Sequence, residues 1–313
     1  MVPRPVQLSS LVDMDNPRAL LREVTSLARE VHPGIRMEKF NALFRDILRL
    51  FSGGYPGFRK CNTDYHDLRH TTDNLLALMR LIHGADRAGI RISEKGVLLG
   101  LTAALLHDVG YIQERGDLSG TGAKHTKAHV RRSIEFAGNY LAKKGFTEKE
   151  LLSVTRIIEC TDASRPVSSL AFPSREIELI GKMQGTADLL GQMADRTYLE
   201  KLLLLYLELT EGEVPGYASE FDLLKKTLRF RELALQRFDR ELGGVRKYLR
   251  FHFRKRHHID RDLYAVTIEN NMSYLKGLVA RHPKDYRKFL RRGGIVKKLV
   301  QKERRARRKG PPC

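Results

Sequence analysis

The feature that most constrains this chain is an apolar run of ten residues, VLLGLTAALL, at positions 97 to 106. Ser93 stands just before the run and suits the N-cap of a helix. A helix that is apolar on all faces is stable only when other elements surround it. The run is too short for a membrane span, which needs about 18 to 20 apolar residues. The sequence therefore predicts a buried central helix with other segments packed around it.

The surrounding segments have the pattern of amphipathic helices. Between residues 17 and 290 apolar residues recur at helical spacing, as in the stretch that begins with Asn16 and Pro17. We find no convincing alternation of a strand and no internal repeat. The predicted fold class is all-α. We expect one helical domain over residues 1–245 and a basic helical extension and tail over residues 246–313.

Charge separates these two regions. The chain has a net charge of +20, and residues 281–313 alone hold fourteen Lys and Arg against two Asp and Glu. Residues 246–261 add seven Lys and Arg against one acid. Such runs can be solvated tails, or they can bind nucleic-acid phosphates or anionic lipid. Nucleic acid and anionic lipid are thus the candidate macromolecular partners of the C-terminal region.

Cysteine usage and the N-terminal residues bear on localisation. Cys61, Cys160 and Cys313 are scattered, which suits neither a disulfide framework nor a clustered zinc site. The first residues lack the charged and apolar regions of a signal peptide. No segment has the length and apolarity of a transmembrane helix. We therefore expect a cytoplasmic protein.

Three predicted helices each carry a metal-capable group in apolar surroundings. His107 and Asp108 end the central helix, where a charged Asp is costly to bury unless it is paired or bound to metal. In YHDLRH, His66 and His70 are four residues apart and would share one face of a helix. Asp188 lies between apolar residues in GTADLLGQ. The His107–Asp108 dyad and the His66–His70 pair each also suit a solvent-facing position, whereas Asp188 is expected to face inward, so the coincidence of the three groups carries the prediction of a site.

The order YHxxxH, HD, AD resembles the HD-domain metal-dependent phosphohydrolase superfamily. YHDLRHTTDNLL and TADLLGQ are most similar to class I cyclic nucleotide phosphodiesterases, and the resemblance covers roughly residues 60 to 210. It implies an HD-domain helical bundle in which His70, His107, Asp108 and Asp188 are the protein ligands of a metal. It also implies that His66 is the general acid that protonates the leaving oxygen.

The resemblance implies further residues around the ligands. Thr161 and Asp162 in IIECTDAS match a Thr-Asp pair that follows the ligand helices. His125 and His129 in KHTKAHVRRS are another pair four residues apart, where other HD proteins place histidines that contact a second metal or phosphate. Because cations surround this pair, a solvent-facing helix is the alternative, and we expect His125 to line the site more readily than His129. We interpret the remaining histidines as surface residues: His32, His83, His252, His257, His258 and His282.

The chemistry of this set fits hydrolysis of a phosphate ester or phosphodiester. Two imidazoles and two carboxylates suit one or two divalent ions such as Mn, Mg, Fe or Zn. In such sites a metal-activated hydroxide is the nucleophile, one oxygen of Asp108 can serve each metal, and His66 supplies the proton. The expected partner is a phosphorylated small molecule, with a nucleotide or cyclic nucleotide as a possible form.

The chain departs from the phosphodiesterase pattern after the dyad. That family continues with an Asp-His-Pro-Gly stretch, whereas this chain has HDVGYIQERG and no counterpart of the glutamine and phenylalanine that clamp a purine. The resemblance therefore implies the metal chemistry rather than one substrate. Two alternatives stay open: an HD-fold di-iron oxygenase, which uses more histidine ligands, and a non-catalytic polyanion-binding adaptor.

Overall fold

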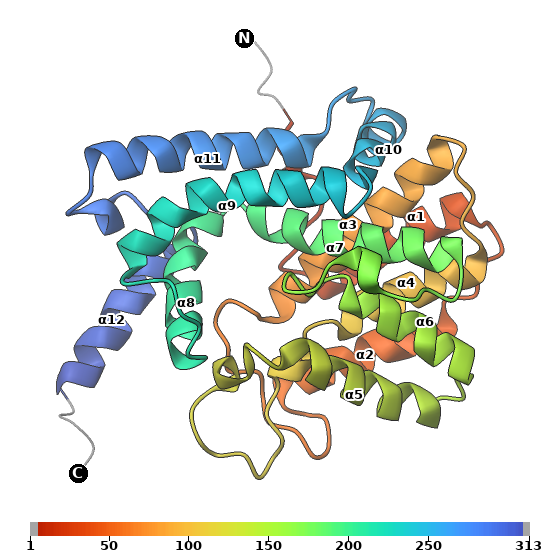
Figure 1. Ribbon diagram of the computed structural model, residues 1–313, viewed down its shortest axis with the longest axis horizontal. Helices are drawn as coiled ribbons and strands as arrows, with labels where there is room; N and C mark the ends of the chain where they lie inside the picture. Colours follow the sequence, from red (N-terminus) through yellow and green to blue (C-terminus); the bar gives the residue numbers. More distant parts are fainter. Residues whose placement is uncertain (1–5, 309–313) are drawn as a thin grey trace.

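The computed structural model describes residues 6–308, with side chains through residue 304. Over this part of the chain there are twelve α-helices and no strand, which confirms the all-α prediction (Figure 1). The helices are α1 (Pro17–Val31), α2 (Glu38–Ser52), α3 (Leu68–Arg87), α4 (Glu94–Leu106), α5 (His129–Lys143), α6 (Glu148–Glu159), α7 (Arg175–Met193), α8 (Tyr198–Glu211), α9 (Glu220–Arg240), α10 (Tyr248–His257), α11 (Leu263–Arg281) and α12 (Ile295–Arg308).

Side-chain caps fix where several helices begin. The Asn16 side chain accepts hydrogen bonds from the first backbone N–H groups of α1, and Pro17 occupies the first helical position. Ser93 caps α4 in the same way, and Thr147 and Glu150 form a capping box at the start of α6. The predictions at Asn16 and Ser93 are confirmed.

The core is built around α3 and α4. The α4 helix is buried on almost every face, as its composition predicts, and it contacts α2, α3, α6 and α7. The α3 helix also contacts α1, α7 and α10. Because α4 and α3 lie at the centre, the polar residues at their ends are held inside the protein rather than at its surface.

Both histidine pairs that were expected to lie on one helix instead span a helix start. Asp67 is the N-cap of α3 and its carboxylate accepts a hydrogen bond from the backbone N–H of His70, so His66 precedes the helix. His125 ends a short 3-10 helix, η3 (Gly122–His125), and His129 is the first residue of α5. The argument from helical spacing is therefore wrong for both pairs. The capping preference of Asp explains the first case, because its side chain bonds to the backbone more favourably before a helix than within one.

The interpretation of His83 and His252 as surface residues is also wrong. Both rings are fully buried where α10 packs on α3. Nδ1 of His252 lies 3.1 Å from Nδ1 of His83, and Nε2 of His83 lies 3.0 Å from a carboxylate oxygen of Glu30. The histidines can be buried because they pair with each other and with Glu30.

The helices after residue 245 pack on those before it. Leu249 and Phe253 of α10 and Leu275 of α11 are fully buried and belong to the same hydrophobic core as α3 and α4. The α12 helix contacts α8. A domain boundary at residue 245 stays a prediction. No helix in the described part of the chain is both long and apolar enough to cross a membrane.

Candidate metal centre

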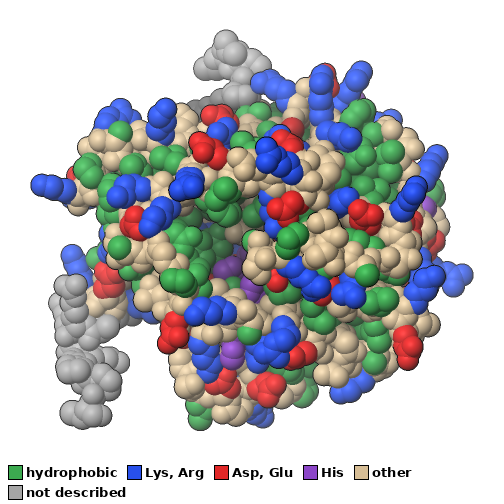
Figure 2. Space-filling view, viewed as in Figure 1, with side chains coloured by type: hydrophobic (Ala, Val, Ile, Leu, Met, Phe, Trp, Pro, Cys, Tyr) green, Lys and Arg blue, Asp and Glu red, His purple; other side chains and the backbone are tan. Residues whose placement is uncertain are grey.

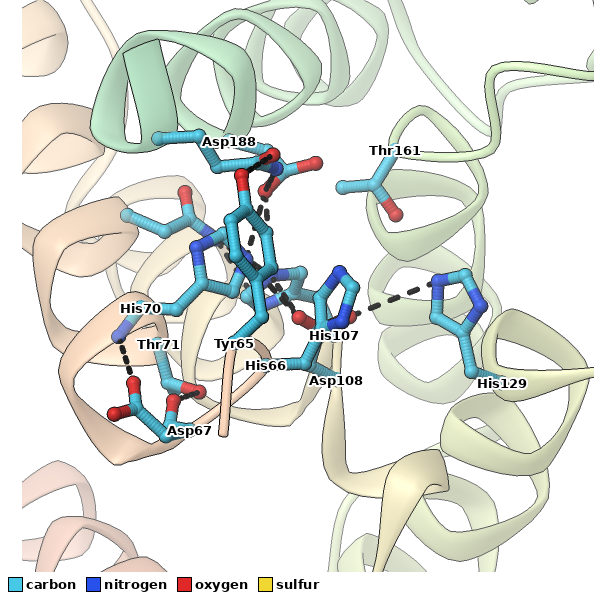
Figure 3. Close-up of polar contacts among 12 residues, drawn as sticks. Tyr65, His66, Asp67, His70, Thr71, His107, Asp108, His129, Thr161 and Asp188 are labelled. Atoms are coloured by element: carbon cyan, nitrogen blue, oxygen red, sulfur yellow. Dashed lines mark hydrogen bonds and ion pairs between the residues drawn. The ribbon is translucent and has the colours of Figure 1, made fainter. Parts of the chain in front are cut away.

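Four predicted ligands from three parts of the chain meet in the interior (Figure 3). His70 lies in the first turn of α3, His107 and Asp108 follow the last residue of α4, and Asp188 lies in the C-terminal half of α7. Their exposed fractions are 4% for His70, 1% for His107, 4% for Asp108 and 9% for Asp188. Two imidazoles and two carboxylates buried together need a positive charge or a dense set of hydrogen bonds.

The spacing of His70, His107 and Asp108 matches part of the ligand shell of one cation, and Asp188 lies close to both histidines. Nε2 of His70 lies 3.0 Å from Oδ2 of Asp108 and 3.1 Å from Oδ1 of Asp188. Nε2 of His107 lies 3.4 Å from Nε2 of His70, 3.3 Å from Oδ2 of Asp108 and 3.6 Å from Oδ1 of Asp188. Ligands at about 2.1 Å from a metal are roughly 3.0 Å apart in an octahedron and roughly 3.4 Å apart in a tetrahedron. His70, His107 and Asp108 form a buried group that could hold a metal ion.

Local hydrogen bonds orient the ligand atoms. Nδ1 of His107 lies 2.9 Å from the carbonyl oxygen of Ala104, so Nδ1–H donates there and the lone pair of Nε2 faces the other ligands. Oδ1 of Asp188 accepts a hydrogen bond from Gln192 at 3.0 Å. Oδ2 of Asp108 is buried, and its polar neighbours are Nε2 of His70 at 3.0 Å and Nε2 of His107 at 3.3 Å. This carboxylate oxygen faces the same small space as the two imidazole nitrogens.

The electrostatics of the cluster also call for positive charge. Burial alone would lower the pKa of His70, but close contact with Asp108 and Asp188 raises it to about 9. Burial alone would raise the pKa of Asp108 and of Asp188, but His107 and His70 lower both. In the chain without a metal, protons on the imidazoles thus supply the charge that a divalent ion would bring.

His66 lies beside the cluster and is held by an acid that the sequence analysis missed. Nδ1 of His66 lies 2.7 Å from Oε2 of Glu208, a buried residue of α8, and the His66 ring stacks on Tyr111 with centroids 4.3 Å apart. The centroids of the His66 and His70 rings are 5.6 Å apart. Glu208 also accepts a hydrogen bond from the backbone N–H of Tyr65. The available signal was an acid within an apolar helix, LLLLYLELTEG, which is the same signal that singled out Asp188.

His129, rather than His125, reaches the cluster. Nε2 of His129 lies 3.7 Å from Oδ1 of Asp108, and its Nδ1–H donates to the carbonyl of Thr126. Burial lowers the pKa of His129, which favours the neutral ring with a free lone pair on Nε2. The His125 ring instead lies 3.3 Å from a carboxylate oxygen of Asp117. The expected preference for His125 over His129 is reversed because the chain turns between η3 and α5.

Thr161 and Asp162 lie outside the set of bonded residues. The hydroxyl of Thr161 donates to the carbonyl of Ile158, and Figure 3 draws no polar contact between Thr161 and Asp188. Asp162 accepts hydrogen bonds from the backbone N–H and hydroxyl of Ser164 and so closes a turn. Among the described residues, neither side chain bonds to one of the four predicted ligands.

The four predicted ligands are buried, whereas the side chains of His66 and His129 beside them are 13% and 24% exposed. Figure 2 shows histidine side chains at the floor of a hollow in the molecular surface.

Comparison of the chain with known protein families finds no match, and comparison with curated proteins finds none. The resemblance to HD-domain phosphohydrolases therefore rests on the motif residues, and the geometry of their side chains is an independent observation.

Proposed function

We propose that this protein is a metal-dependent phosphohydrolase that cleaves a phosphate ester or phosphodiester. The observation that carries the proposal is that the Nε2 atoms of two buried histidines, His70 and His107, each lie 3.0 to 3.6 Å from a carboxylate oxygen of Asp108 and of Asp188, beside a histidine that is paired with an acid. The expected substrate is a phosphorylated small molecule, with a nucleotide or cyclic nucleotide as one form. A basic C-terminal region that binds nucleic acid or anionic lipid is a separate proposal.

His70, His107, Asp108 and Asp188 would hold the metal. Their mixed imidazole and carboxylate donors suit Mn, Fe or Zn. The two carboxylates also suit Mg, which prefers oxygen ligands. When bound, such an ion activates water as a hydroxide nucleophile and neutralises charge on the phosphoryl oxygens. The second oxygen of Asp108 faces His129, so these two residues could hold a second ion.

His66 would serve as the general acid. Glu208 can only accept a hydrogen bond when ionised, so Nδ1 of His66 carries the proton of that contact and Nε2 is left for the substrate. When the ring also carries a proton on Nε2, Nδ1–H still donates to Glu208 and holds the ring in place. Its Nε2 proton can then pass to the leaving oxygen as the P–O bond breaks. Stacking on Tyr111 fixes the plane of the ring.

The test compares His66→Ala with His70→Ala on two substrates. On an alkyl phosphodiester, His66→Ala should lower kcat by roughly two to four orders of magnitude, the usual contribution of general acid catalysis, while metal content is kept. On a p-nitrophenyl ester the loss should be smaller, because that leaving group needs no proton. His70→Ala should lose metal and activity together. Lys143→Ala, an exposed position on α5, is the control.

Three outcomes would contradict the assignment. If His66→Ala loses metal as His70→Ala does, His66 is a ligand or a structural support. If it is as active as wild type on the alkyl diester, it has no part in proton transfer. If the metal-loaded wild type hydrolyses no phosphoester and yet binds polyanions, the adaptor alternative is favoured.

The di-iron oxygenase is the second candidate, and the position of His129 is what favours it. A third histidine 3.7 Å from Asp108 enlarges the histidine set in the way that such enzymes require. His125, which that alternative also needs, contacts Asp117 instead. Spectra of the iron-loaded protein and consumption of dioxygen would distinguish an oxygenase from a phosphohydrolase.

A further inference from the structure

Gln192 bonds to a predicted metal ligand, and a buried tyrosine holds Gln192 in turn. It lies in the last turn of α7, four residues after Asp188, so the two side chains share one face of the helix. Nε2 of Gln192 lies 3.0 Å from Oδ1 of Asp188. Its Oε1 lies 3.0 Å from the hydroxyl of Tyr65, a residue that is 3% exposed. Figure 3 shows the Tyr65 side chain extending toward Asp188.

The chemistry of the three groups sets the direction of both hydrogen bonds. An ionised Asp188 can only accept, so the amide nitrogen of Gln192 faces it and donates. The amide oxygen then faces Tyr65, whose hydroxyl donates to it. An amide can thus link a carboxylate to a hydroxyl, because it carries a donor and an acceptor side by side. A carboxylate or an apolar side chain of similar length cannot make both bonds.

Tyr65 also connects this pair to the predicted general acid. Its backbone N–H donates to Oε1 of Glu208, and the other oxygen of that carboxylate lies 2.7 Å from Nδ1 of His66. Tyr65 therefore bonds to Glu208 through its backbone and to Gln192 through its side chain. The hydroxyl can be removed without touching the backbone bond, so the contact toward the metal ligands can be tested apart from the contact toward His66.

We propose that Gln192 is a positioning residue of the metal centre, which fixes Oδ1 of Asp188 for the cation, and that Tyr65 acts through it. Oδ1 is the oxygen that lies 3.1 Å from Nε2 of His70 and 3.6 Å from Nε2 of His107. The hydrogen bond from Gln192 limits rotation of this carboxylate. Such bonds orient ligands, and their loss lowers metal affinity by roughly ten- to a hundredfold. The inference rests on the metal centre of the proposed function and is independent of the substrate.

The Zn affinity of the full chain, measured by competition with a chelating dye, tests the proposal. Gln192→Met keeps the length of the side chain and removes both hydrogen bonds, so it should weaken Zn binding by roughly ten- to a hundredfold. Tyr65→Phe should weaken it by roughly three- to tenfold, the contribution of one hydrogen bond. Gln236→Met, the same substitution at an exposed position of α9, is the matched control and should bind Zn as wild type does.

The double variant separates a positioning role from a purely structural one. If Tyr65 acts through Gln192, adding Tyr65→Phe to Gln192→Met should weaken Zn binding no further, whereas the effects of independent packing defects would multiply. The visible spectrum of the Co-loaded protein reports the geometry of the ligands. Gln192→Met should therefore change that spectrum, and Gln236→Met should not. Circular dichroism checks that the helices of each variant are intact.

Failure of this inference differs from failure of the metal centre. Wild-type Zn affinity together with an unchanged Co spectrum in Gln192→Met would overturn the positioning role and leave the metal centre standing. Effects that multiply in the double variant would overturn the action of Tyr65 through Gln192. If Gln192→Met does not fold, Tyr65→Phe decides, and unchanged Zn binding by that variant would overturn the proposal. Absence of saturable Zn binding by wild type would overturn the metal centre and this inference with it.

Discussion

The buried pair of His83 and His252 makes the stability of the protein depend on pH. Glu30 can only accept from Nε2 of His83, which leaves Nδ1 of His83 as the acceptor for Nδ1–H of His252. Nε2 of His252 is then unprotonated, and it has no partner in the interior. Burial, together with the charge of Arg80, holds the pKa of His252 far below its ordinary value.

The size of the effect follows from linkage. The unfolded chain takes up a proton on this histidine below pH of about 6.5, whereas the folded chain does not, so stability falls as pH falls below that value. Relative to its value well above pH 6.5, the free energy of unfolding is lowered by this group by about 1.4 kcal/mol at pH 5.5 and by about 2.7 kcal/mol at pH 4.5. His252→Asn keeps an N–H near the position of Nδ1 but cannot take up the proton. As the pH falls from 6.5 to 4.5, the free energy of unfolding of the variant should therefore increase by about 2 kcal/mol relative to that of wild type.

Urea unfolding of both proteins across this pH range measures the difference directly. The variant can be less stable than wild type at pH 7, because it packs differently. The prediction concerns only how the difference in free energy of unfolding between the two proteins changes with pH. His258→Asn, at an exposed position, is the control and should run parallel to wild type. A difference between wild type and His252→Asn that stays constant from pH 6.5 to pH 4.5 would refute the reasoning.

Two further predictions concern packing and charge. A Cβ at Gly110 would lie 2.0 Å from the carbonyl oxygen of His129, so Gly110→Ala should lower the free energy of unfolding by about 1 to 3 kcal/mol or more, measured by urea denaturation. Gly138→Ala, in α5 with nothing within 4 Å of the new Cβ, should be neutral or stabilising, and an equal loss in both variants would contradict the clash. Lys297 and Lys298 are exposed on α12, and changing both to Gln should reduce the slope of log K against log salt for duplex DNA by about 2 if each contacts one phosphate. An unchanged slope would place DNA binding elsewhere.

The parts of the structure that could be predicted from the sequence are those with a local physical cause. The run from residue 97 to residue 106 had to be buried because it offers no polar face, and Asn16 and Ser93 mark helix starts through their own side chains. Asp108 and Asp188 stood out as charges in apolar surroundings, a signal that needs no knowledge of their neighbours. The structure brings these two together with His70 and His107.

The parts that could not be predicted depend on partners far along the chain. The pair formed by His83 and His252 joins residues 169 positions apart, and neither residue alone signals burial. Glu208 meets His66 across 142 positions. The closeness of His66 to His70 was expected from helical spacing, but the cap formed by Asp67 starts the helix after His66. Here the neighbours are brought together by tertiary packing, which periodicity does not report.

The metal content of the purified protein tests the central assignment most directly. After incubation with Mn, Fe or Zn and removal of free ions, wild type should retain one or two ions per chain. Asp108→Asn should retain none while its helix content is unchanged, because the substitution removes a ligand charge from a buried site that needs it. Asp162→Asn, at the turn closed by Ser164, should retain the wild-type amount. Full retention of metal by Asp108→Asn, or no retention by wild type, would contradict the metal centre.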